Sequence, residues 1–134
     1  MGWTNPPIPS KAGRARRAVC AVLRAEAHAG ADLEMEGLLA DFARHVRDEE
    51  PGCLSYIVTR ALGSRTQFVA HALFVDWSGF RAHGETEHLD RLLPMLTPLM
   101  AAPVSVEIFL EVERPRALRR GYAWREVDAD RQSE

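Results

Sequence analysis

The sequence predicts an α+β fold in which an antiparallel sheet carries two helices on one of its faces. Three observations lead to this prediction. Four segments place apolar residues at the two-residue period of β-strands. Two further segments repeat apolar residues at the three- and four-residue spacing of helices. The chain has 134 residues, which is enough for one domain with a hydrophobic core but not for two independent folds.

The first predicted strand follows an irregular arm at residues 1–15, which is rich in proline and glycine. Residues 17–27, RAVCAVLRAEA, are apolar on both faces, so we expect a central strand that is covered on both sides. Residues 33–47 form the clearest helix, and Asp32 is its expected N-cap. The apolar stripe of this helix consists of Met35, Leu38, Leu39, Phe42 and Val46.

The next two strands should form a hairpin. Residues 53–60, CLSYIVTR, place Leu54, Tyr56 and Val58 on one face of a strand. The short connection ALGSRT then leads into a strand that begins at Gln67. One face of that strand carries Phe68, Ala70, Ala72 and Phe74, and the other carries Val69, His71, Leu73 and Val75.

At Asp76 the apolar period changes from that of a strand to that of a helix. Asp76 can cap the helix, and Trp77, Phe80 and His83 follow at helical spacing. We therefore expect His83 on the inward face, one turn beyond Phe80.

A further helical segment should begin after Thr86, which can serve as its cap. Its apolar stripe consists of Leu89, Leu92, Leu93, Leu96 and Leu99. Pro94 and Pro98 should kink or interrupt this segment, because each proline removes a backbone donor and clashes with the preceding turn. Residues 104–112 form the last strand, with Val104, Val106, Ile108 and Leu110 facing inward, and residues 114–134 form a charged extension.

The resulting order of elements is βαββαβ, which is the ferredoxin-like arrangement, and the domain should span residues 16–113. In this topology the third strand lies between the first and the second. Cys20 and Cys53 should therefore be about two strand spacings, or ~9.5 Å, apart. A disulfide needs Cα atoms within about 7 Å, so we expect two free thiols.

The two helices can cover only one face of the sheet, although its strands are apolar on both faces. An exposed apolar sheet face needs a partner. The simplest partner is a second copy of the chain, packed sheet to sheet around a two-fold axis. We therefore expect a homodimer.

Charge and composition exclude several classes of protein. The net charge of −2 argues against nucleic-acid binding, which depends on neutralising phosphates. No apolar run approaches the roughly 20 residues needed to span a membrane. The N-terminal segment lacks the organisation of a signal peptide, so we expect a cytoplasmic protein. No Cys-x-x-Cys motif or Cys/His cluster is present, so no metal site is expected.

Three motifs carry a resemblance to a known family. They are EPGCLSY at residues 50–56, F-x5-F-x-D-x2-G-F-x2-H at residues 68–83 and T-x-H at residues 86–88. Together they resemble the antibiotic biosynthesis monooxygenase family, over about residues 16–113. This chain has Gly79 where the family usually has alanine, Ala72 where it commonly has glutamate, and Phe74 where it commonly has tryptophan.

The resemblance implies a ferredoxin-like protomer that forms a dimeric α+β barrel, with a pocket between the sheet and the helices. It also implies a cofactor-independent monooxygenase that needs neither metal nor flavin. Molecular oxygen would be the co-substrate, and the substrate would be a small electron-rich aromatic such as a quinol, an anthrone or a polyketide-like molecule. Such chemistry requires a dry aromatic pocket, a base and donors for the developing anion.

The candidate catalytic residues are His83, which matches the motif, and His71, although His71 lies on the opposite face of its strand. Tyr56 could hold a substrate oxygen through its hydroxyl group. The other candidate substrate-binding residues are Phe74, Trp77, Phe80 and His88. A structural role is the alternative for each of these residues: the histidines as hydrogen-bonding groups and the aromatic residues as parts of the core.

Three other functions stay open at this stage. The first is a non-catalytic dimer that binds a small hydrophobic ligand or serves as a scaffold, which the alanine at position 72 favours. The second is haem degradation, but this activity would need a polar residue, typically asparagine, on the first strand, and residues 17–27 contain no asparagine. The third is a cyclase or isomerase that uses the same base without oxygen.

Overall fold

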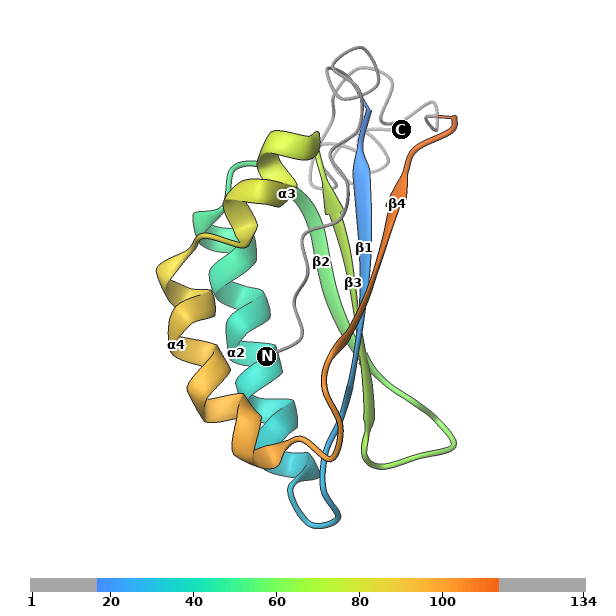
Figure 1. Cartoon of the computed structure of the whole chain (residues 1–134), viewed down its shortest axis with the longest axis vertical. Coiled ribbons are helices and arrows are strands. Elements are labelled where there is room, and N and C mark those ends of the chain that lie inside the picture. The colour runs from blue at the N-terminus through green and yellow to red at the C-terminus, as the bar shows by residue number, and fades with distance from the viewer. Residues whose placement is uncertain (1–16, 114–134) are drawn as a thin grey trace, which may run out of the picture.

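The computed structural model describes residues 17–113, so the predicted arm at residues 1–15 and the predicted extension at residues 114–134 lie outside the described residues. Figure 1 shows how the elements are arranged. In chain order they are β1 (Val19–Glu26), α2 (Asp32–Glu49), β2 (Cys53–Arg60), β3 (Gln67–Phe74), α3 (Trp77–His83), α4 (Glu87–Leu96), the 3-10 turn η1 (Thr97–Leu99) and β4 (Ser105–Leu110).

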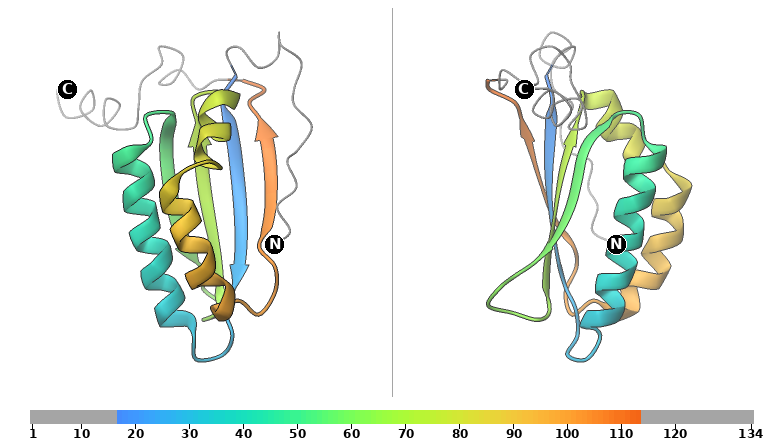
Figure 2. Two further views of the ribbon diagram at one scale, coloured as in Figure 1. Left: turned by 60° about the vertical axis from the view of Figure 1, so that its left-hand side comes forward. Right: turned by 180° about the vertical axis from the view of Figure 1, so that it is seen from behind.

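The four strands form one antiparallel sheet in the order β2-β3-β1-β4. This order confirms the predicted ferredoxin-like α+β fold, with β3 between β1 and β2. The helices form a single layer against one face of the sheet (Figure 2). Cys20 and Cys53 are free thiols, as predicted.

The core lies between the helices and the inward face of the sheet. The predicted inward face of β3 is confirmed, because all four of its inward side chains are buried. Ring packing continues from this face into α3, since Phe74 contacts Phe80 edge to face at 5.6 Å between ring centroids. The larger buried side chains of the core are Met35, Leu39, Phe42, Val46, Tyr56, Phe68, Phe74, Trp77, Phe80, Leu92 and Leu96.

Both ends of the helical layer differ from the prediction. Asp32 is the first residue of α2 rather than its cap, and the N-cap residue Ala31 makes no side-chain hydrogen bond. The Asp32 carboxylate lies 3.7 Å from the guanidinium of Arg60. Because it stands in the first turn of α2, it also interacts favourably with the positive end of the helix dipole. At the other end, α4 runs through Pro94 and ends at Leu96. Pro94 is exposed and lies in the last turn, so its missing N–H costs the helix only one backbone bond.

A β-bulge at the start of β2 contradicts one predicted face. Cys53 pairs with Phe74 and Ser55 pairs with Leu73, so Leu54 is an extra residue in the ladder. An extra residue reverses the faces of everything on one side of it. Cys53 therefore packs against the core, whereas the alternation predicted Leu54 on the face of Tyr56.

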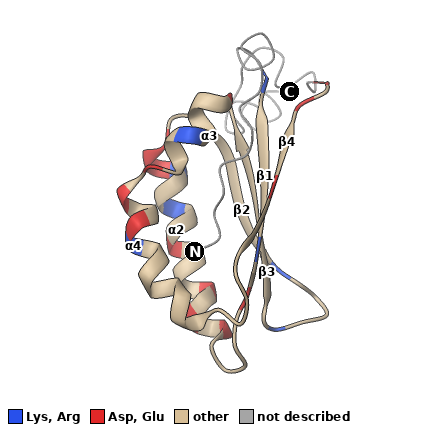
Figure 3. Ribbon diagram, in the orientation of Figure 1, with Lys and Arg blue, Asp and Glu red and all other residues tan. Residues whose placement is uncertain are grey.

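The outward face of the sheet keeps large apolar side chains exposed. Ile57, Val75 and Phe109 are 54%, 41% and 50% exposed. Charged residues are concentrated on α2 and α4, and the strands carry few of them (Figure 3). Within residues 17–113, no helix combines the length and the apolar character that a membrane crossing requires.

Candidate active site

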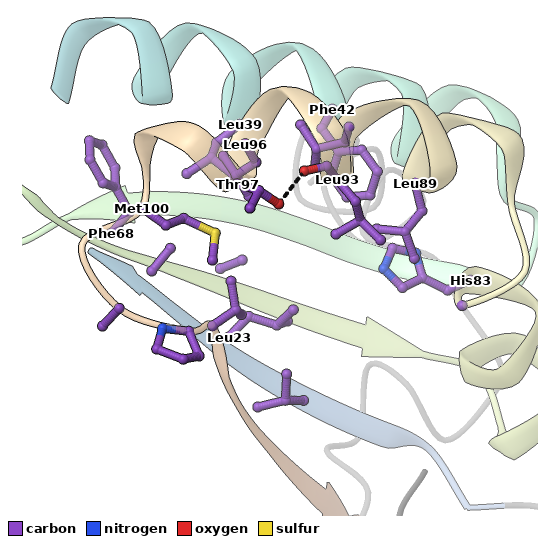
Figure 4. Close-up of a pocket in the computed structure, with 18 of the residues that line it drawn as sticks. Leu23, Leu39, Phe42, Phe68, His83, Leu89, Leu93, Leu96, Thr97 and Met100 are labelled. Carbon is purple, nitrogen blue, oxygen red and sulfur yellow. Dashed lines mark hydrogen bonds between the residues drawn. The ribbon is translucent and has the colours of Figure 1, made fainter. Parts of the chain in front are cut away.

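A pocket of about 590 Å³ lies between the sheet and the helices. Figure 4 shows that it extends along α4, from His83 at one end to Phe68 and Met100 at the other. Most of its lining is aliphatic or aromatic. The residues that line it include Leu23, Ala25, Leu39, Phe42, Tyr56, Phe68, Ala70, His83, Leu89, Asp90, Leu92, Leu93, Leu96, Thr97, Met100 and Val106.

Few polar side chains reach this pocket. The hydroxyl of Thr97 donates to the carbonyl of Leu93 at 2.7 Å, so it is already used within the helix (Figure 4). Asp90 is exposed to solvent. The buried polar groups of the lining are the imidazole of His83 and the phenol of Tyr56.

Helix α3 sets the position of His83. The Asp76 carboxylate accepts a hydrogen bond from the backbone N–H of Gly79 at 2.8 Å, which confirms the predicted cap and fixes the start of α3. His83 then lies at the end of the helix and is 5% exposed. Its ring packs against Phe74 at 5.1 Å and Tyr56 at 5.8 Å between centroids.

A buried carboxylate orients the imidazole of His83. Nδ1 of His83 lies 2.9 and 3.0 Å from the two carboxylate oxygens of Glu50, and only 8% of the Glu50 side chain is exposed. When Nδ1–H donates to Glu50, Nε2 carries the lone pair and is the nitrogen left for the pocket. This arrangement makes Nε2 a candidate general base.

The same contacts govern the ionisation of Glu50. Burial raises the pKa of Glu50, but the hydrogen bond and positive charge of His83, followed by those of His88, outweigh burial and hold the pKa below its ordinary value of 4.5. Glu50 is therefore a carboxylate at neutral pH. A carboxylate in this position stabilises an imidazolium at His83 once Nε2 has taken a proton.

His88 contributes to the same cluster from the first turns of α4. It is 7% exposed, so it faces the interior, a point that the sequence left open. Its Nε2 lies 2.5 Å from Oε2 of Glu50 and its Nδ1 lies 3.2 Å from Oε2 of Glu49. His88 contacts the base through Glu50 rather than lining the pocket.

Tyr56 lines the pocket, as the sequence predicted. Burial raises the pKa of Tyr56, and the nearby Cys53 and Glu50 raise it further. Its phenol is therefore a neutral donor at physiological pH. No residue of the described range 17–113 makes a hydrogen bond with this hydroxyl, so it is available to a ligand.

The predicted aromatic residues occupy a different place from the one expected. Phe74, Trp77 and Phe80 pack in the core behind His83 and do not line the pocket. Trp77 and Phe80 contact each other at 5.4 Å. Among the described residues, the indole N–H of Trp77 is buried without a hydrogen-bond partner. The aromatic residues that line the pocket beside Tyr56 are Phe42 and Phe68 instead.

His71 is not brought together with His83. It is exposed on the outward face of β3, where its Nε2 lies 3.2 Å from the hydroxyl of Thr59. The two-residue period of the strand places it opposite Ala70 and Ala72, which face the core. The sheet therefore separates His71 from the pocket.

The sequence analysis did not identify Glu50 and Phe42 as functional residues. Glu50 stands in the EPGCLSY motif, next to a proline that ends α2, and this was the available signal. Its partner His83 is 33 residues further along the chain, so the motif alone could not reveal the pair. Residues 17–113 contain no group of three or more metal-ligating side chains that could hold a metal ion.

Comparisons with known proteins agree with this architecture. The family model described as antibiotic biosynthesis monooxygenase matches residues 18–93. A protein from Caulobacter crescentus CB15, provisionally assigned to the same monooxygenases, is similar in structure with a TM-score of 0.70 and 24% identity, covering 75% of this chain and 94% of that chain.

A variant of SnoaB, a cofactor-independent oxygenase from Streptomyces nogalater, is also similar in structure. The TM-score is 0.64 at 22% identity, covering 74% of this chain and 97% of that chain. No curated protein matches the sequence. The family model spans more than half of the chain, so this protein belongs to the antibiotic biosynthesis monooxygenase family.

Proposed function

We propose that this protein is a cofactor-independent monooxygenase that oxidises an electron-rich aromatic substrate, such as a quinol, an anthrone or a polyketide-like molecule, with molecular oxygen. One observation carries the proposal: an imidazole held by a buried carboxylate lies at the end of an apolar pocket of about 590 Å³. Membership of the family and the structural similarity to SnoaB, a cofactor-independent oxygenase, support the class of reaction.

The base starts the reaction. Nε2 of His83 takes a proton from a phenolic or enolic substrate, and Glu50 stabilises the resulting imidazolium. The electron-rich substrate anion passes one electron to O₂, and the substrate radical and superoxide combine into a peroxide anion. His83 returns its proton to this peroxide. Loss of water then converts a CH₂ group of an anthrone into a carbonyl, with one oxygen atom in the product and the other in water.

The pocket supplies the remaining requirements of this chemistry. Its apolar walls exclude water, which strengthens the interaction between the imidazolium and the substrate anion. The neutral phenol of Tyr56 donates to the substrate oxygen that carries the developing charge. Phe42 and Phe68 pack against the ring system of the substrate.

Oxygen uptake by metal-free and flavin-free protein, with a panel of quinols and anthrones, tests the proposal. We expect saturable uptake that survives a chelator and falls at least about tenfold in His83→Ala. His28→Ala is the matched control, because His28 is exposed in the loop after β1. Uptake no faster than in buffer for every substrate would refute the proposed activity. His71→Ala, run alongside, tests the predicted contribution of His71 directly.

A non-catalytic hydrophobic-ligand-binding dimer is the second candidate. The predominantly apolar lining of the pocket and the alanine at position 72 favour it. Oxygen consumption distinguishes the two candidates. A binding protein would bind the aromatic compounds with a measurable affinity but would not consume oxygen.

We also propose that the protein forms a homodimer through the outward face of its sheet. The exposed side chains of Ile57, Val75 and Phe109 on this face support the proposal, because burying them on a second copy removes apolar surface from water. Sedimentation velocity should give the mass of a dimer for the wild type and of a monomer for Phe109→Asp. A monomeric wild type at micromolar concentration would contradict it.

A further inference from the structure

Four titratable side chains form a continuous chain from the pocket to the surface of the protein. Nδ1 of His83 contacts Glu50, and Oε2 of Glu50 lies 2.5 Å from Nε2 of His88. Nδ1 of His88 then lies 3.2 Å from Oε2 of Glu49. The side chains of His83, Glu50 and His88 are only 7–8% exposed, whereas that of Glu49 is 53% exposed.

Counting hydrogen-bond donors indicates how protons are distributed in this chain. An ionised carboxylate only accepts hydrogen bonds, so each imidazole nitrogen that contacts one must carry a proton. Nδ1 of His83 and Nε2 of His88 both form hydrogen bonds with Glu50, so these two nitrogens carry the protons that the carboxylate accepts. Nδ1 of His88 lies within ion-pair distance of Glu49. The two histidines thus bind the same carboxylate through different ring nitrogens.

The surroundings of the cluster favour strong interactions within it. Phe42 packs against both imidazoles, at 5.7 Å from His83 and 5.5 Å from His88 between ring centroids. A low-dielectric environment strengthens hydrogen bonds between charged groups.

Other titratable and charged groups face the cluster from two elements. From α2, His45 stacks on His88 at 6.0 Å, and Arg47 interacts electrostatically with Cys53. From β2, Cys53 and Tyr56 interact electrostatically with Glu50. Only the two histidines form hydrogen bonds with the Glu50 carboxylate among the described residues.

We propose that His88 and Glu49 are positioning residues for the base His83. The hydrogen bond from Nε2 of His88 to Oε2 of Glu50 keeps this carboxylate directed at Nδ1 of His83. The contact with Glu49 holds the ring of His88 in that orientation. The result is that Nε2 of His83 is the lone-pair nitrogen whenever a substrate arrives. This inference deepens the proposed function, on which its kinetic readout rests, but its spectroscopic readout does not depend on any reaction.

Nuclear magnetic resonance of isotopically labelled protein tests the proposal directly. Nitrogen-15 shifts should show His83 protonated at Nδ1 and His88 protonated at Nε2, the two nitrogens that contact Glu50. In Glu49→Gln the ring nitrogen shifts of His88 should change, because the carboxylate next to its Nδ1 has been removed. In His88→Gln the carboxyl carbon of Glu50 should titrate at a higher pH, because the hydrogen bond and charge of His88, which lower the pKa of Glu50, have been lost.

A kinetic measurement separates positioning from binding. His88 does not line the pocket, so His88→Gln should lower kcat about tenfold and leave KM nearly unchanged. His28→Gln is the matched control, because His28 is exposed in the loop after β1, away from the four side chains of the cluster. It should leave the Glu50 titration unchanged.

The outcomes distinguish the two proposals. An unshifted Glu50 titration in His88→Gln, or a His88 ring without a proton on Nε2, would overturn the positioning role. Glu49 is half exposed, so Glu49→Gln should fold even if a change at His88 prevents folding, and unchanged ring nitrogen shifts of His88 in this variant are equally decisive. If the resonances behave as expected but no variant consumes oxygen, the positioning chain stands and the proposed function fails.

Discussion

Gly52 and Gly79 are in direct backbone contact. A methyl group on Gly79 would lie 2.8 Å from the carbonyl oxygen of Gly52, and one on Gly52 would lie 2.7 Å from Cα of Gly79. The same carbonyl accepts a hydrogen bond from the backbone N–H of Val75 at 2.8 Å. The turn that follows Glu50 is thereby fixed against the start of α3, which ends at His83. This contact joins the two halves of the candidate active site.

Gly79→Ala should therefore destabilise the protein. The new methyl group would meet backbone atoms, which cannot move aside as a flexible side chain can, and overpacking of this kind costs about 1–3 kcal/mol. Urea denaturation measures the change in the free energy of unfolding. Gly37→Ala is the control, because Gly37 lies within α2 with no atom within 4 Å of the added methyl group. That variant should be more stable by about 0.5–1 kcal/mol, and equal losses in the two variants would contradict the argument.

Replacing Glu50 by glutamine should impair catalysis more than it impairs binding. Glutamine preserves the size of the side chain and can accept the Nδ1–H of His83. However, it supplies no charge to stabilise the imidazolium. We expect kcat to fall about 100-fold with little change in KM. Steady-state oxygen uptake measures both, with Glu34→Gln on the exposed side of α2 as the control. A kcat within twofold of wild type would remove Glu50 from the proposed mechanism.

Acid should weaken the fold through Glu50. Its pKa in the folded protein lies below the ordinary value of 4.5, so the folded state binds fewer protons than the unfolded state. The stabilisation is therefore complete above pH 4.5 and is lost as the pH falls through the lowered value. Urea unfolding between about pH 6 and pH 3 should show a steeper loss of stability for wild type than for Glu50→Gln. Parallel curves would mean that Glu50 titrates alike in both states.

The elements and their faces could be predicted from local patterns in the sequence. The change of period at Asp76 placed α3 correctly, and the spacing from Phe80 to His83 placed the imidazole inside. The bulge at Leu54 could not be predicted, because nothing in CLSYIVTR distinguishes an extra residue from regular alternation. It is visible only in the pairing of β2 with β3.

The composition of the site was harder to predict than its location. Aromatic residues next to His83 in the chain pack behind it, because α3 packs Phe80 against Phe74 and Trp77 against Phe80, and none of the three lines the cavity. The groups that complete the site are Phe42 in α2 and Glu50, the C-cap residue of that helix. The position of Glu50 beside His83 depends on the contact between the turn at Gly52 and Gly79 in α3, which are distant in sequence, and no periodicity encodes such a contact.

Tyr56→Phe should separate stability from function. The Tyr56 hydroxyl makes no hydrogen bond within residues 17–113, so its removal breaks no bond in the fold. Thermal unfolding should give a Tm equal to or slightly above that of wild type. If the hydroxyl donates to a substrate oxygen, its loss should lower kcat/KM by roughly 2–10-fold, the value of one hydrogen bond. Unchanged kcat/KM would reduce Tyr56 to a wall of the pocket, and a large fall in Tm would mean that its hydroxyl stabilises the fold.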